Sequence, residues 1–252
     1  MSDADPPAIT VVNQGGSSPV VLLCEHASNH IPARYGRLGL PPAELERHIA
    51  WDIGAAEMAR EASRRLDAVL VLAGFSRLLI DCNRPLSAPS SIPARSEDTD
   101  IPGNIGISPA ERAARDRQFF APFRDGVAAL LDARLAAGRP TLLIGMHSFT
   151  PVYHGVARPW QVGVLYGHST GLAHALLAAL RRDTTLTVGD NEPYRVTTTG
   201  DFTVPWQGEA RGIATALFEV RQDLIAAAAA AQDWGARLAA VMAAAVERQR
   251  PG

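Results

Sequence analysis

The sequence lacks three features that would each point to a class of protein. Its charges nearly cancel, at a net charge of −2 over 252 residues. It contains no basic run or block of like charges, so a nucleic-acid partner is not expected. No apolar stretch is long enough to cross a membrane. The N-terminus has no basic flank followed by a long apolar run, which argues against a signal or transit peptide. We therefore expect a soluble, cytoplasmic protein.

Cysteine is also scarce. The two cysteines, Cys24 and Cys82, both lie inside strand-like apolar runs. Buried free thiols are the ordinary interpretation of such positions, and a disulfide would be unusual in a reducing compartment. A chain of this length can bury a large core, and no linker divides it, so we expect one domain that spans residues 1–252.

Strand-like runs alternate with helical patterns along the chain. The strand-like runs are Val20–Cys24, Ala68–Leu72, Arg77–Ile80, Thr141–Met146, Gln161–Tyr166 and Ile213–Val220. The helical patterns are Pro41–Leu66, Pro109–Ala137, Thr170–Arg182 and Asp223–Arg248, the last with Asp223 as its N-cap. The alternation predicts an α/β fold in which helices cover a mostly parallel sheet. Residues 83–108 and 187–211 are expected to be loops, and loops this long tend to be functional.

Four of the strand-like runs end in polar side chains. The four groups are Glu25-His26, Asp81 to Arg84, His147-Ser148, and Glu219 to Arg221. Because the carboxyl ends of parallel strands meet at the same edge of a sheet, where open α/β proteins bind ligands, we expect these groups to converge there.

Two histidines that each follow a buried run, His26 and His147, suggest a metal site. A catalytic zinc ion takes three protein ligands and leaves a fourth position open for water, so an acidic ligand is also needed. The candidates are Asp52, Glu25 and Asp81. We favour Asp52, which precedes a helical stripe, although an acid there often only complements the helix dipole. Glu25 follows closely, but neighbouring side chains on a strand point to opposite faces.

The remaining polar groups suggest substrate binding and proton transfer. Arg84 has a planar fork that matches a carboxylate, and Asn83 adds a donor and an acceptor beside it. The alternative for Arg84 is a salt bridge with a surface acid. Glu219 lies among apolar neighbours and so must be paired, protonated or used, and it suits a general base. A buried salt bridge with Arg221, which would share its face, is the equal alternative.

Six segments together resemble the N-formylglutamate amidohydrolase family. They are CEHASNHIP, HIAWDIGA, SRLLIDCNRP, GMHSF, GDNEPY and FEVRQDL, and their order covers nearly the whole chain. The order of the polar groups is also distantly similar to that of zinc carboxypeptidases. The resemblance implies a three-layer sandwich with a mixed, mainly parallel, eight-stranded sheet between layers of helices.

The same resemblance implies roles for individual residues. His26 and His147 match zinc ligands, Asn83 and Arg84 match carboxylate-binding residues, and Glu219 matches the general base. Carboxypeptidases have a glutamate ligand where this chain has Asn29, so the acidic ligand must come from elsewhere, from Asp52 or Glu25. The segment Glu25-His26-Ala27-Ser28 also differs from the Pro-His-Ser-Gly of histidine-degrading members, which indicates a sister branch.

Several weaker candidates complete the predicted substrate site. Asn191 and Tyr194 resemble a family substrate loop, and Tyr194 would close over the site. Arg95 and Arg158 lie in or beside long loops and would polarise the substrate carbonyl or hold a second carboxylate. Arg221 is a further candidate for substrate binding.

The sequence thus predicts an amidohydrolase that depends on zinc or another divalent metal. Its small-molecule substrate would be an N-acyl amino acid with an acidic side chain, similar to N-formylglutamate, and its linear amide would be cleaved by metal-activated water with Glu219 as base. Two alternatives stay open. One is a metal-free hydrolase with Cys24 or Ser148 as nucleophile, although the chain has no G-x-S-x-G motif. The other is a non-catalytic module that binds an acidic metabolite.

Overall fold

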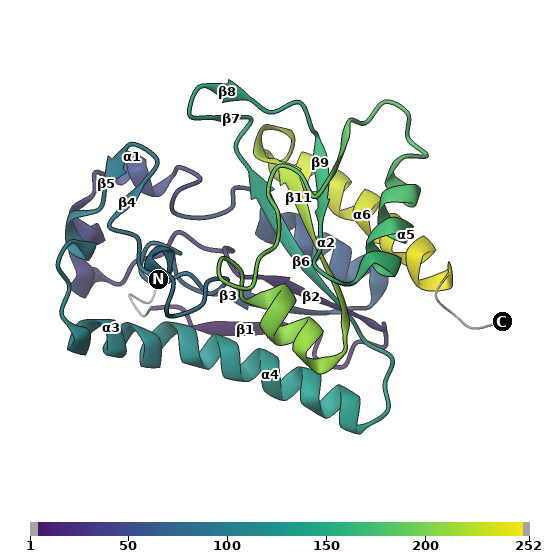
Figure 1. Cartoon of the computed structure of the whole chain (residues 1–252), viewed down its shortest axis with the longest axis horizontal. Coiled ribbons are helices and arrows are strands. Elements are labelled where there is room, and N and C mark those ends of the chain that lie inside the picture. Colours follow the sequence, from purple (N-terminus) through teal and green to yellow (C-terminus); the bar gives the residue numbers. More distant parts are fainter. Residues whose placement is uncertain (1–4, 249–252) are drawn as a thin grey trace.

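A mixed sheet forms the centre of the molecule. The computed structural model describes residues 5–248. Seven strands are joined in the order β1-β3-β2-β6-β11-β9-β10 (Figure 1). In chain order they are β1 (Ile9–Val12), β2 (Val20–Cys24), β3 (Val69–Ala73), β6 (Leu142–Phe149), β9 (Val162–Leu165), β10 (Val188–Asp190) and β11 (Ala214–Arg221). The pairs β1–β3 and β9–β11 are antiparallel and the other neighbouring pairs are parallel. This confirms the mixed, mainly parallel sheet, with seven strands in place of the eight that the resemblance implied.

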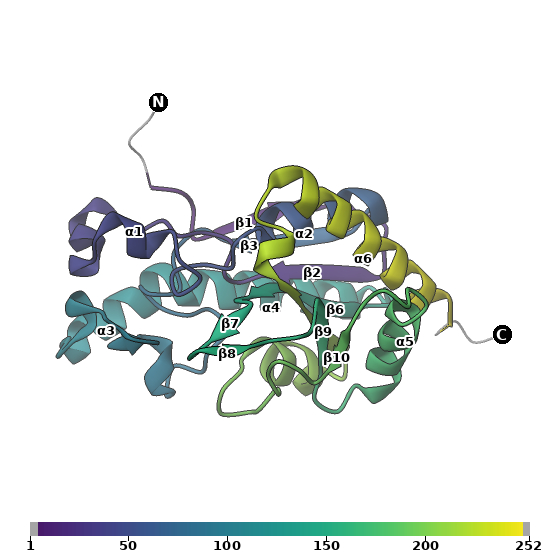
Figure 2. The same cartoon turned by 90° about the horizontal axis from the view of Figure 1, so that it is seen from above.

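Helices cover both faces of this sheet. They are α1 (Pro42–Leu45), α2 (Ala55–Leu66), α3 (Pro109–Arg115), α4 (Ala121–Ala136), α5 (Thr170–Leu180) and α6 (Ala228–Arg248). Helices α2, α5 and α6 share one apolar cluster with one face of the sheet, and α4 packs on the other face. Figure 2 shows α2 and α6 side by side on one side and α4 on the opposite side. No helix within residues 5–248 is long and apolar enough to span a membrane.

The burial of β2 on both faces explains why its sequence is apolar throughout. Val20, Leu22 and Cys24 lie in the cluster with α2 and α6, whereas Val21 and Leu23 lie in the cluster with α4. Successive side chains of a strand point to opposite faces, and here both faces are covered, so every position is buried. The unbroken apolar run therefore marks a central strand.

One predicted strand is wrong. Residues 77–79 form a turn, in which the amide of Leu79 donates to the carbonyl of Ser76 at 3.0 Å, and Ile80 follows it outside any strand. Leu78, Leu79 and Ile80 are buried, but they pack into a separate apolar cluster with Phe119 and Phe120 outside the sheet. Burial alone therefore explains their apolar character. The additional strands β1 and β10, which the sequence analysis missed, are short and lie at the two edges of the sheet.

Two predicted helix boundaries are also wrong. The pattern Pro41–Leu66 is divided into α1 and α2, because the intervening segment turns at Gly54, which has a left-handed φ of 78°. A side chain at Gly54 would also meet the carbonyl oxygen of Ile225. The last helix begins at Ala228, and Asp223 lies in a 3-10 turn before it, where its carboxylate binds Arg221.

Short elements outside the sheet flank its carboxyl edge. Two hairpins, β4–β5 (Arg95–Ser96 and Thr99–Asp100) and β7–β8 (Val152–Tyr153 and Val156–Ala157), project from it. The two predicted loops contain β4, β5 and β10 together with helical turns, and otherwise run as irregular chain. These loops and hairpins form the surroundings of the site described below.

Close packing of α6 on α2 gives the first prediction. A Cβ atom at Gly235 would lie 2.5 Å from the carbonyl oxygen of Met58 and 2.8 Å from Cβ of Glu61. We expect Gly235→Ala to destabilise the protein by about 1–3 kcal/mol, since overpacking outweighs the helix propensity of alanine. Urea unfolding provides the measurement. The control is Gly171→Ala in α5, where the new methyl group would pack against nothing within 4 Å. The stability of this variant should equal or exceed that of the wild type. Equal unfolding midpoints for Gly235→Ala and wild type would contradict the expectation.

Candidate active site

Three separate segments bring two histidines and an aspartate together at the carboxyl edge of the sheet. His26 lies in the turn that follows β2, and His147 lies near the end of the neighbouring strand β6. Asp52 lies in the turn before α2, and its backbone amide donates to the carbonyl of His26 at 2.9 Å. The end of a fully buried strand therefore fixes each histidine, and one backbone hydrogen bond fixes the aspartate beside them.

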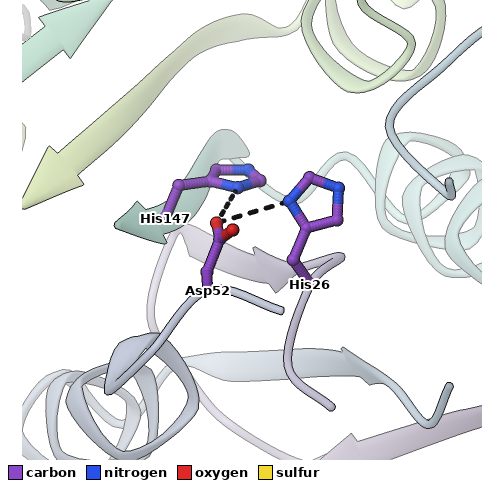
Figure 3. A group of neighbouring side chains, drawn as sticks. All are labelled: His26, Asp52 and His147. Atoms are coloured by element: carbon purple, nitrogen blue, oxygen red, sulfur yellow. Dashed lines mark hydrogen bonds and ion pairs between the residues drawn. The ribbon is translucent and has the colours of Figure 1, made fainter. Parts of the chain in front are cut away.

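One oxygen of Asp52 joins both imidazoles (Figure 3). Oδ2 of Asp52 lies 3.3 Å from Nδ1 of His26 and 2.8 Å from Nδ1 of His147. All three residues are buried, and one donor atom from each lies within 4.8 Å of the others. Two imidazoles and a carboxylate at this spacing can hold one divalent metal ion.

The outer nitrogen of each imidazole faces a second carboxylate. Nε2 of His26 lies 2.7 Å from Oδ1 of Asp81, and Nε2 of His147 lies 3.2 Å from Oε2 of Glu25. The other oxygen of Glu25 accepts a hydrogen bond from the hydroxyl of Thr203. Such outer carboxylates fix the orientation of metal-binding imidazoles. Of the two acidic residues that the sequence left in competition, Asp52 therefore lies within the group and Glu25 lies behind His147.

Arg77, which the sequence analysis missed, ties the two carboxylates around His26 together. Its Nε and Nη2 lie 3.0 and 2.7 Å from Oδ2 of Asp81, and its Nη1 lies 3.4 Å from Oδ1 of Asp52. The turn at residues 77–79 places Arg77 and Asp81 on the same side, because they are four positions apart. Arg77 begins an apolar run that was predicted to be a strand, so the sequence did not indicate that its guanidinium contacts Asp52 and Asp81.

The charges of the group favour a bound cation. Glu25, Asp52, Asp81 and Glu219 are four buried carboxylates, and Arg77 is the guanidinium that contacts two of them. Burying carboxylates without compensating positive charge is costly. The chemistry of this donor set, together with the excess of negative charge, fits zinc or a similar divalent ion at His26, Asp52 and His147.

The pKa values of these residues show the same balance. Burial would raise the pKa of Asp52, but the two imidazoles hold it well below its usual value. Burial would lower the pKa of His147, but the carboxylates of Glu25 and Asp52 raise it well above its usual value. Asp52 is therefore ionised, and its negative charge requires positive partners, which imidazolium protons or a metal ion can supply.

Glu219 differs from the other acids because its carboxylate is not fully paired. It lies on β11 directly opposite His147 of β6. The side chain is buried, and its Oε2 has no hydrogen-bond partner within residues 5–248. Burial raises the pKa of Glu219 to about 7. The expected alternative, a salt bridge with Arg221, is absent from the described residues, because Arg221 binds Asp223 at 2.8 Å.

A cavity of about 520 Å³ opens beside the group. Among the predicted site residues, Asn83, Arg84, Arg95, Tyr194 and Glu219 line it, together with His26, Asp52 and His147. Three predicted substrate-binding residues, Arg158, Asn191 and Arg221, are not among the lining residues. The side-chain oxygen of Asn191 instead accepts a hydrogen bond from the amide of Tyr166, which joins two loops beyond the strands β9 and β10.

The other predicted residues make the following contacts. Arg158 donates to the hydroxyl of Tyr194 at 2.8 Å and stacks between Tyr194 and Tyr153, so it supports a wall of the cavity. Arg95 is exposed and binds Asp100 across its own hairpin. The side-chain oxygen of Asn83 accepts from the backbone amides of residues 202 and 203, which leaves its amide nitrogen as the group available to a ligand.

Several residues that were not predicted also line the cavity, among them Arg77, His48, Arg195 and Asp201. Arg195 and Asp201 lie in the long segment 187–211, so the length of that loop was the available indication. His48 lies 3.2 Å from Glu97 of the β4–β5 hairpin, a contact that no local pattern reveals.

Comparisons with known proteins identify the family. A family model described as N-formylglutamate amidohydrolase matches residues 18–226. The chain belongs to the N-formylglutamate amidohydrolase family. This membership confirms the resemblance of the six segments and supports a hydrolase activity on an amide.

Two crystal structures are similar to this member of the family. Gene product Atu2144 from Agrobacterium tumefaciens is 40% identical with a TM-score of 0.94, and the match covers 98% of each chain. N-formylglutamate amidohydrolase from Ralstonia eutropha JMP134 is 17% identical with a TM-score of 0.69, and the match covers 96% of this chain and 98% of that one. The second likeness shows the shared fold. Among curated proteins, none matches this chain.

The geometry also bears on the metal-free alternative for this amidohydrolase family member. Cys24 is fully buried in β2, and burial raises the pKa of its thiol well above the usual value, which opposes a reactive thiolate. The hydroxyl of Ser148 donates to the carbonyl of Ile53 at 2.9 Å. Both imidazoles direct Nδ1 toward Asp52, so neither residue has the histidine partner that a nucleophile requires.

A comparison of two acid variants tests which carboxylate belongs to the metal group. We expect protein purified without added metal to contain about one divalent ion per chain, and Asp52→Ala to lose it, since a ligand is removed. Glu25→Gln should keep the ion with an affinity lowered by about 10- to 100-fold, because only the support of His147 is weakened. Elemental analysis and chelator competition measure both. Loss of metal from Glu25→Gln together with retention by Asp52→Ala would reverse the assignment.

Proposed function

We propose that this protein is a metal-dependent amidohydrolase that cleaves the linear amide of an N-acyl amino acid similar to N-formylglutamate. Family membership supports the amide hydrolysis. The observation that carries the proposal is the buried group of His26, Asp52 and His147 beside Glu219, a carboxylate with a raised pKa and a free oxygen. Together they supply an ion site and a proton acceptor at one end of a cavity.

His26, Asp52 and His147 would hold a zinc ion or another divalent metal ion. Such an ion, when bound, lowers the pKa of a water molecule and polarises the acyl carbonyl of the substrate. Asp81 and Glu25 would keep the two imidazoles in the orientation that directs Nδ1 at the ion. The protein therefore contributes a fixed and correctly charged ligand set.

Glu219 would act as the general base. Glu219 lines the cavity, and a pKa near neutrality would let it accept a proton from the attacking water and return that proton to the departing amine nitrogen. A carboxylate with a normal pKa would be a weaker base and would accept the proton less readily. The burial that raises the pKa thus suits Glu219 to both steps.

Arginine side chains would bind and polarise the substrate. Arg84 and the amide nitrogen of Asn83 would hold the carboxylate of the amino acid. Arg77, the guanidinium beside Asp52, is better placed than Arg95 or Arg158 to stabilise negative charge on the carbonyl oxygen. Arg195 lines the cavity and makes no ion pair within residues 5–248, so we assign it to an acidic side chain of the substrate.

The variant Glu219→Gln tests the base. We expect kcat on N-formylglutamate, or on the best substrate from a panel of N-acyl amino acids, to fall about 10²- to 10⁴-fold, because proton transfer is lost. Metal content should stay unchanged, since Glu219 is not in the ligand group. The same substitution at exposed Glu247 in α6 serves as the control and should keep full activity. Full kcat in Glu219→Gln would refute this role.

Inhibitors separate the metal enzyme from the two other functions. We expect a strong chelator to abolish hydrolysis and added zinc to restore it, and thiol and serine reagents to have little effect, because Cys24 and Ser148 lack a base. Initial rates measure each treatment. Activity that survives chelation but not a thiol or serine reagent would favour the metal-free hydrolase. Bound metal without turnover of any panel member would favour the binding module.

A further inference from the structure

Arg84 already holds a carboxylate that belongs to the protein. Its Nη1 lies 3.2 Å from Oδ1 of Asp201, and both side chains are largely buried and line the cavity. Asp201 comes from the long loop before β11 and lies far from Arg84 in the sequence. The ion pair therefore joins the predicted carboxylate-binding residue to the wall of the cavity.

The hydrogen bonds of Arg84 leave one side of its guanidinium free. Nη1 donates to the backbone oxygen of Asn83 at 3.1 Å and to Asp201 at 3.2 Å. Nε and Nη2 have no partner within residues 5–248. A guanidinium carries five donors in a rigid plane, so an edge with two parallel N–H groups remains for a second carboxylate.

Asp201 is itself fixed in place. Its Oδ2 accepts a hydrogen bond from the amide of Thr197 at 2.9 Å, and its own amide donates to the carbonyl of Thr197 at 2.9 Å. The next two amides along the chain, of Phe202 and Thr203, donate to the side-chain oxygen of Asn83. Hydrogen bonds to Thr197 on one side of Asp201 in the chain, and from Phe202 and Thr203 on the other, therefore fix its position independently of Arg84.

Two effects of Asp201 on a bound substrate oppose each other. Its negative charge would repel a substrate carboxylate, which would weaken binding. Its contact also restrains a long and flexible side chain, which would strengthen binding, because less conformational freedom is lost when the carboxylate arrives. The guanidinium lies between the two carboxylates and offers a different donor to each, so we expect restraint to exceed repulsion.

We propose that Asp201 is a positioning residue that holds Nη1 of Arg84 and so presents Nε and Nη2 to the carboxylate of the substrate. The proposal rests on the proposed function, because it concerns the same carboxylate. It assigns the selectivity for a free carboxylate to the pair of residues and to the loop that carries Asp201, rather than to Arg84 alone.

Steady-state kinetics test the effect on substrate. For Asp201→Ala we expect KM for the N-acyl amino acid to rise about 10- to 100-fold with kcat within about twofold, the effect of losing one charged hydrogen bond. Asp201→Asn keeps an acceptor oxygen and should fall between wild type and Asp201→Ala. The matching substrate with a carboxamide in place of the carboxylate should be cleaved equally by all three. A lower KM in Asp201→Ala, or an equal loss on both substrates, would overturn the proposal.

A double-mutant cycle and a matched ion pair serve as controls. In an Arg84→Met background, Asp201→Ala should change KM by less than about twofold, because the group it positions is already gone. Asp132 binds Arg211 at 2.7 Å, and neither residue lines the cavity. Asp132→Ala should leave KM and kcat as in the wild type. Additive effects of the Arg84 and Asp201 substitutions would also overturn the proposal.

The NMR spectrum of Arg84 gives a measurement that needs no substrate. The chain has 24 arginines and no lysine, so the spectrum contains many arginine Nε–H signals. The signal of Arg84 is assigned by its loss in the variant Arg84→Lys. We expect that signal to show a rigid side chain in the wild type and a mobile one in Asp201→Ala, with Asp132→Ala unchanged. A rigid Arg84 in Asp201→Ala would refute the positioning role. If the wild type hydrolyses no N-acyl amino acid, the proposed function fails while this experiment still decides the role of Asp201.

Discussion

The shared contact of one Asp52 oxygen with two imidazoles is the interaction on which the site depends. It joins the turn after β2, the end of β6 and the turn before α2, three segments that are far apart in the chain. All three residues are buried, so the contact forms in a region where an unpaired charge is costly. Its geometry requires that β2 and β6 be neighbours in the sheet, and the two strands pair in parallel.

Charges alternate outward from this contact. Each imidazole lies between Asp52 and a second carboxylate, which is Asp81 for His26 and Glu25 for His147. Arg77 forms ion pairs with both Asp52 and Asp81. In such an arrangement every group restrains its neighbour, so the donor atoms are held at a spacing that could accommodate a metal ion. Glu219 is the exception, because its Oε2 has no hydrogen-bond partner within residues 5–248, and this is why we propose it as the group that moves a proton.

The long loops complete the cavity beside this centre. Residues from the segment 187–211, among them Tyr194, Arg195 and Asp201, form a wall of the cavity, and hydrogen bonds to Asn83 hold that segment in place. The side-chain oxygen of Asn83 therefore fixes the loop, and under the proposed function its amide nitrogen and Arg84 would meet the substrate carboxylate. A scaffold of buried strands with functional loops at its edge explains how one fold can accept different substrates.

The sequence by itself determined the elements that local pattern controls. The apolar runs gave the strands β2, β3, β6, β9 and β11, and the polar residues after them identified His26, His147 and Glu219 as members of one site. These features are readable because strand burial and the polarity of strand ends are properties of short segments. The resemblance of six ordered segments added the family, which the family match confirms.

Only the tertiary structure decided the contacts between segments. Asp52 was only narrowly favoured over Glu25 as the candidate ligand until the fold placed Glu25 behind His147, and Arg77 was predicted to lie in a strand until a turn brought it to Asp81. The fold likewise gave Arg84 a salt bridge with Asp201, and it paired Arg221 with Asp223 in place of Glu219. The physical reason is that the position of a charged side chain is set by which opposite charges lie within a few ångströms, and the sequence order does not specify those distances.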